Sequence, residues 1–216
     1  MKAKQILAIA AVPVLAAGYI VYHPGVAYAE TVLAKTLTAT SFQQGGSYTV
    51  DGMHTCLGFD IGHLGLSRVQ GRFSKMTGAL QIDAKDLSKS SVKVTADASS
   101  IDTAVAPRDA DLRSANFFDV EKFPTVTFES TQIKKAGNGY NAAGNLTIHG
   151  VSKPITIHFK QYGPIKDPWG NTRIGVVADP LVIHRSDFGM TFDAETVSND
   201  VNVHLSLEAT QDKAPK

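Results

Sequence analysis

Short runs of alternating apolar and polar residues dominate the chain from residue 47 onward. Successive side chains of a β-strand point to opposite faces, so such alternation is typical of a strand with one buried face. The apolar members of these runs are Leu57, Phe59 and Ile61; Val92, Val94 and Ala96; Val126 and Phe128; Leu146 and Ile148; Ile155, Ile157 and Phe159; and Val201, Val203, Leu205 and Leu207. The pattern predicts an antiparallel sheet with one apolar and one polar face.

Turn residues separate these runs. Gly137-Asn138-Gly139 predicts a hairpin loop, the stretch from His149 to Pro154 is expected to link the next two strands, and Asp167–Asn171 is a third break. The runs amount to roughly eight strands, a number that can close into a small barrel and so remove exposed sheet edges.

One segment, residues 102–124, departs from the alternation. Within it, Pro107–Ser114 predicts a short helix, because proline is favoured in the first helical turn. Three aromatic residues, Phe117, Phe118 and Phe123, follow this helix. We expect this aromatic connection to pack over one end of the barrel.

The N-terminus has the pattern of a secretory signal. Two lysines, Lys2 and Lys4, precede an uncharged stretch that ends in Ala27-Tyr28-Ala29. We predict a signal peptide over residues 1–29, cleaved after Ala29, and therefore export to the periplasm. The alternative is an uncleaved anchor, because Ile6–Tyr22 is only slightly shorter than a membrane-spanning helix.

The rest of the chain is assigned to a flexible leader over 30–46, a barrel domain over 47–212 and a tail over 213–216. Without Lys2 and Lys4 the chain keeps 19 basic and 20 acidic residues, a net charge of −1. A nucleic-acid-binding surface is usually strongly basic, so no nucleic-acid partner is expected.

Cys56 is the only cysteine, so the chain forms no internal disulfide, and we expect Cys56 to be a small buried hydrophobe. His54 and Cys56 lie two apart in one strand and are the one pair considered for copper or zinc. The histidine spacing matches no standard metal motif, so no metal site is expected. The chain also has no Gly-x-Ser-x-Gly elbow, and we expect no enzyme activity.

Five blocks, in this order, resemble the YceI-like family of periplasmic lipid- or polyisoprenoid-binding proteins. They are His54–Phe73, Arg108–Phe118 with Phe123-Pro124, Gly144–Pro154, Asp167–Gly170 and Arg185–Gly189. The resemblance implies an all-β fold, an eight-stranded antiparallel lipocalin-like barrel with a short helix or ordered loop near one end. It also implies that the lumen takes an isoprenoid-like lipid or quinone, bound non-covalently, with no other cofactor.

The alternation provides a physical reason for this expectation, because the apolar face of a closed single sheet must line its lumen. By this parity the lumen candidates are Leu57, Phe59, Ile61, Val94, Phe128, Ile157 and Phe159. The candidates for contact with a polar headgroup are His63, Arg108 and Arg113. We expect a monomer or homodimer that makes transient contact with a membrane.

Other interpretations remain open at this point. Alternation also fits a two-sheet sandwich, or a structural or stress-response barrel whose lumen is filled by its own side chains. A metal- or redox-linked protein would use Cys56 and His54. His63 could bond a backbone carbonyl in a tight turn, and Arg108 and Arg113 could form surface ion pairs with Asp109.

Overall fold

The computed structural model describes residues 39–40, 42 and 44–213. The predicted signal peptide, most of the predicted leader and residues 214–216 lie outside this part of the chain. Within it, no helix combines the length and the apolar character needed to cross a membrane.

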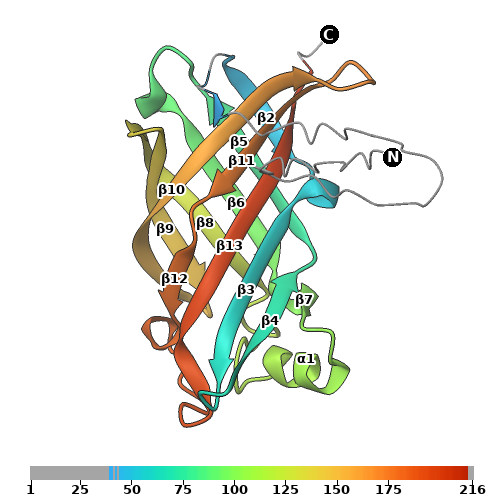
Figure 1. The fold of residues 1–216 in the computed structure, drawn as a ribbon, viewed down its shortest axis with the longest axis vertical. Coiled ribbons are helices and arrows are strands. Elements are labelled where there is room, and N and C mark those ends of the chain that lie inside the picture. Colours follow the sequence, from blue (N-terminus) through green and yellow to red (C-terminus); the bar gives the residue numbers. More distant parts are fainter. Residues whose placement is uncertain (1–38, 41, 43, 214–216) are drawn as a thin grey trace, which may run out of the picture. The chain divides into compact units, whose positions relative to one another are not determined.

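Eight long antiparallel strands form the fold, and several of them are interrupted, so that 13 strand segments are distinguished (Figure 1). The eight are β2 (Gly46–Val50) with β3 (Cys56–His63); β4 (Ser67–Phe73) with β5 (Met76–Ile82); β6 (Ser91–Asp97) with β7 (Ile101–Asp102); β8 (Thr125–Ala136); β9 (Gly139–Ile148); β10 (Val151–Lys166); β11 (Thr172–Ala178) with β12 (Leu181–His184); and β13 (Val197–Gln211). The remaining segment, β1 (Ala39–Thr40), pairs with β10.

The sheet closes on itself. Each long strand pairs with the next along the chain, β11 joins β10 to β13, and β13 pairs in turn with β2 and β3. The expected eight-stranded antiparallel barrel is therefore confirmed, and a two-sheet sandwich is excluded. In one half of the barrel the ring is looser, since β12 pairs with β13 alone among the described strands.

The turns follow the predicted chemistry, with one correction. Gly137 and Asn138 join β8 to β9, as expected. The stretch predicted as a six-residue link is shorter, because only His149 and Gly150 form the turn and β10 already begins at Val151. Both turn residues have positive φ, 50° and 73°, and this backbone matches the twist of a two-residue hairpin.

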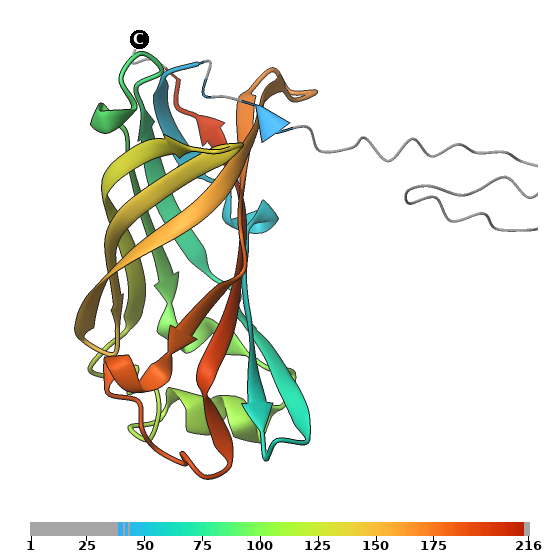
Figure 2. The ribbon, with the colours of Figure 1, turned by 60° about the vertical axis from the view of Figure 1, so that its left-hand side comes forward.

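The predicted helix is present as α1 (Ala106–Arg113), with a proline in its first turn. Four short 3-10 helices complete the described elements: η1 (Gly52–His54), η2 (Leu87–Lys89), η3 (Ala98–Ser100) and η4 (Arg185–Phe188). Figures 1 and 2 show α1 at one end of the barrel, beside the end of β3. The aromatic connection after α1 packs there, with the ring of Phe118 5.6 Å from that of Phe73.

The apolar parity forms the core. Val94, Ala96, Phe128, Leu146 and Phe159 are among its buried members, and Leu57 and Ile157 pack against them while half-buried. Three residues of the predicted leader also belong to the folded unit. Ala39 and Thr40 pair with β10, and Phe42 is buried in the core.

Candidate functional site

The barrel contains a cavity of about 330 Å³. Most of its wall consists of apolar side chains that alternate along the strands, so the apolar parity faces the lumen. Six of the seven lumen candidates line this cavity: Leu57, Phe59, Ile61, Val94, Phe128 and Ile157. Ligand pockets in proteins typically begin at about 300 Å³, so this space suits a small apolar molecule or part of a long one.

The seventh candidate, Phe159, lines a smaller cavity of about 40 Å³. Val94, Phe128 and Ile157 are shared by the walls of both cavities. The two cavities therefore adjoin each other at these residues.

Several residues of the wall were not among the sequence candidates. Phe117 and Phe118 contribute to it, in addition to covering the barrel end as expected. Val69, Leu181 and Ile183 also line it, and each alternates with an outward residue, so a wider parity count would have found them. Met190 lies in a loop, where no periodic pattern could reveal it.

Polar groups gather at the α1 end of the cavity. His63 ends β3, Arg108 and Asp111 belong to α1, Arg185 opens η4, and Asp193 precedes β13. The N–H of Leu64 donates to the carbonyl of Thr196, which joins the β3 end to the start of β13. This end is the polar mouth of an otherwise apolar lumen.

The two arginines of this mouth bond to neutral acceptors. Arg108 donates from Nε to the hydroxyl of Thr103 and from Nη2 to its carbonyl, both over 2.8 Å. Arg185 is 4% exposed, and burial lowers the pKa of its guanidinium. Its donors reach the carbonyls of Ser198, Met190, Phe192 and Val197. Within the described chain neither guanidinium is hydrogen-bonded to a carboxylate.

The other two headgroup candidates differ. His63 is exposed and lines the cavity. Arg113 is not among the residues that line the cavity, and its contact with a headgroup stays a prediction. Its guanidinium donates to the carbonyls of Ser99 in η3 and Ile101 in β7 over 2.7 and 2.8 Å, and so anchors α1 to the segment before it.

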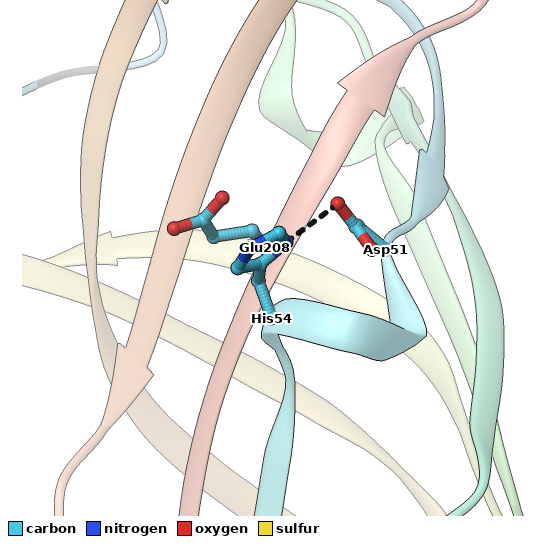
Figure 3. Close-up of side chains that lie close together, drawn as sticks. All are labelled: Asp51, His54 and Glu208. Atoms are coloured by element: carbon cyan, nitrogen blue, oxygen red, sulfur yellow. Dashed lines mark hydrogen bonds and ion pairs between the residues drawn. The ribbon is translucent and has the colours of Figure 1, made fainter.

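Cys56 is exposed, contrary to the expectation that it is buried. The reason is parity: Leu57 faces the lumen, so its neighbour Cys56 faces outward. Among the described residues, one group brings three candidate metal-ligand atoms within 4.8 Å of one another, namely Asp51, His54 and Glu208 (Figure 3). Cys56 is not part of this group.

The guanidinium of Arg173 binds two members of this group. Arg173 donates to Asp51 over 2.7 Å and to Glu208 over 3.2 Å. Hydrogen bonds from Arg173 and then His54 lower the pKa of Asp51 to about 2. The arrangement is that of an ion-pair cluster around Arg173.

Comparison with known proteins agrees with this architecture. The YceI-like domain model matches residues 48–209. A UPF0312 protein of Serratia proteamaculans is 42% identical over 190 residues, which cover 85% of this chain and 98% of that protein.

Two solved structures share the fold. The YCEI protein of Campylobacter jejuni is 30% identical, with a TM-score of 0.62 over 68% of this chain and 88% of that one. A polyisoprenoid binding domain from Saccharophagus degradans is 16% identical, with a TM-score of 0.63 over 78% of this chain and 100% of that one. The match to the domain model and the identity to the Serratia protein together show that this chain belongs to the YceI-like family.

Proposed function

We propose that this chain is an exported binding protein that holds one long isoprenoid-like lipid in its barrel. The observation that carries the proposal is the cavity of about 330 Å³ with its predominantly apolar wall. Withdrawing an apolar chain from water contributes roughly 25 cal/mol for each Å² buried. Contact along this apolar wall therefore stabilises a bound prenyl chain. A lumen filled by its own side chains would leave no such space.

The distribution of polar groups suggests how the lipid is oriented. The apolar chain would extend from the main cavity toward the smaller one, and the head would remain at the α1 end beside His63, Arg108 and Arg185. Of these, His63 and Arg108 offer N–H donors to a hydroxyl or a quinone carbonyl. Asp111 and Asp193 lie at the same mouth and disfavour a strongly anionic head.

A further observation supports the proposal. The Saccharophagus domain, which shares the fold, is described as polyisoprenoid-binding. This likeness is an analogy of fold, so the argument for this chain rests on its own cavity. No chemical step is required of a carrier, and we propose binding without catalysis.

Export to the periplasm is proposed from residues 1–29 and their signal-like pattern. Expression of the full chain in a Gram-negative host, followed by N-terminal sequencing of the periplasmic fraction, tests this point. The expected mature N-terminus is Glu30. Recovery of the uncleaved chain in the membrane fraction would instead support the anchor.

Native mass spectrometry of gently purified protein tests the binding function. The expected result is an added mass equal to one isoprenoid lipid or quinone per barrel. After delipidation, added polyprenols or quinones should restore such a complex. A protein that is lipid-free when purified and that also ignores both classes of added lipid would refute the carrier function.

A further inference from the structure

An aromatic cluster lies in the barrel toward the end opposite α1. His149 directly follows the last residue of β9. Its ring contacts the ring of Phe123, which follows α1, and its Nδ1 lies 3.3 Å from the carbonyl of Phe188 in η4. The C-terminal end of β9 therefore lies at the α1 end of the barrel. Tyr140, at the start of β9, therefore lies toward the other end of the barrel. The cluster consists of Tyr140 with Phe42 and Phe159.

Phe42 is the member of this cluster that does not come from a barrel strand. Its ring centroid lies 4.7 Å from that of Tyr140 and 6.3 Å from that of Phe159. Its backbone N–H donates to the hydroxyl of Tyr140 over 3.1 Å. Just before it, β1 pairs with β10, so hydrogen bonds hold the segment from both sides. Phe42 is 9% exposed as a result.

The smaller cavity lies directly against this ring. Phe42 and Phe159 line it together with Leu80 and Ile133. Part of its wall is shared with the main cavity through Val94, Phe128 and Ile157. An apolar chain that fills the main cavity and continues past the shared positions therefore meets Phe42.

We infer that Phe42 is the floor of the lumen and limits the length of the lipid chain that the barrel encloses. This inference rests on the proposed function and deepens it, because it assigns chain-length selection to one residue. The head of the lipid stays at the polar mouth near α1, so each added isoprene unit must be accommodated at the Phe42 end. Phe42, which supplies the floor, comes before β2 and belongs to none of the eight strands.

Chain-length competition tests the inference. Delipidated full-length mature protein is mixed with an equimolar series of linear prenyl alcohols that differ by one isoprene unit, and the bound species are identified by native mass spectrometry. Phe42→Ala should shift the longest chain bound by at least one isoprene unit upward. Phe42→Trp, which places a bulkier side chain at the floor and leaves less room for the lipid, should shift the distribution toward shorter chains.

Phe192→Ala is the matched control, because it removes the same ring from a residue that is 48% exposed and does not line either cavity. Its chain-length distribution should equal that of the wild type. Thermal unfolding establishes that each variant is folded. If Phe42→Ala does not fold, Phe42→Trp and Phe42→Leu decide the question, with opposite expected shifts.

The outcomes separate this inference from the proposed function. A wild-type protein that takes up none of the alcohols would refute both. If the wild type binds the alcohols and the folded Phe42 variants bind the same distribution of chain lengths, the barrel is a carrier but Phe42 does not limit the length of the bound chain. A shift of equal size in Phe192→Ala would likewise overturn the role of Phe42.

Discussion

The guanidinium of Arg173 donates to the carboxylate of Asp51 over 2.7 Å and so joins two residues that lie 122 positions apart in the chain. Asp51 stands at the break between β2 and β3, and Arg173 lies in β11. The same guanidinium donates to Asp167 over 2.9 Å and to Glu208 over 3.2 Å. Arg173 thus connects β11 to the turn that precedes it, to the break between β2 and β3, and to β13.

This cluster should make the fold sensitive to acid. Burial alone would raise the pKa of Asp167, but hydrogen bonds from Asn171 and Arg173 lower it to about 2, as hydrogen bonds from Arg173 and His54 do for Asp51. A carboxyl with a lowered pKa stabilises the fold fully above its ordinary pKa of 3.8 and loses that contribution as the pH falls toward 2. Unfolding by urea, measured from pH 7 downward, should show this loss.

Arg173→Gln should lower the free energy of unfolding at neutral pH by roughly 3 kcal/mol, because it leaves largely buried carboxylates without their cation. It should also flatten the loss of stability between pH 4 and pH 2. Lys93→Gln is the control, since it breaks an exposed pair with Glu129 and should cost less than about 1 kcal/mol. Equal costs in the two variants would contradict a special role of Arg173.

A charge placed on the lumen wall should weaken lipid binding. Ile155 lines the main cavity, and the adjacent Thr156 is exposed. We expect Ile155→Asp to weaken binding by about 2 kcal/mol or more, roughly thirty-fold in Kd, because bound lipid would bury the carboxylate. Thr156→Asp should leave Kd nearly unchanged. Titration with a fluorescent polyene lipid measures both, and similar losses in both variants would show that the parity does not separate lumen from surface.

Gly71 is expected to control the position of Phe59 in the lumen. A Cβ at Gly71 would lie 2.8 Å from Cε1 of Phe59 and 2.8 Å from Cγ2 of Thr103, closer than real side chains approach. Gly71→Ala should therefore push the Phe59 ring into the cavity and weaken lipid binding several-fold. The double variant with Phe59→Leu should regain most of that loss. If the double variant binds no better than Gly71→Ala, the ring is not the cause.

The rate of thiol labelling can distinguish the outer face of β3 from the face that lines the cavity. Cys56 is exposed on the outer face, so a maleimide should label it in the folded protein at the same rate with and without lipid. In a chain that carries Cys56→Ser, the variant Leu57→Cys places the thiol on the cavity wall instead. Bound lipid should slow its labelling at least tenfold. Protection of Cys56 by lipid would show that the outer face takes part in binding.

Much of this architecture could be predicted from the order of residues. Period-2 alternation in runs such as Ile155, Ile157 and Phe159 identifies strands and their apolar face, because the direction of side chains in a strand is a local property. The helix over Ala106–Arg113 and the turn at Gly137 and Asn138 were predictable for the same reason. Local backbone preferences act over a few residues, and the sequence displays them.

Residues that work through distant contacts could not be assigned in this way. Arg108 and Arg113 both lie on α1 and both donate to backbone carbonyls, yet only Arg108 lines the cavity. Arg185 and Met190 reach the cavity from outside the strands, where no period marks them. Their roles depend on which chain segments fold against them.

The sequence by itself determined the strands, their apolar parity and therefore which side chains could face a lumen. Only the tertiary structure decided that this lumen keeps an open cavity, that Arg173 holds Asp51, and that Phe42 lies against Tyr140 and Phe159. The physical reason is the range of the interactions. Alternation follows from the geometry of one strand, whereas a cavity, an ion-pair cluster and a floor arise from packing between segments that only closure of the barrel brings together.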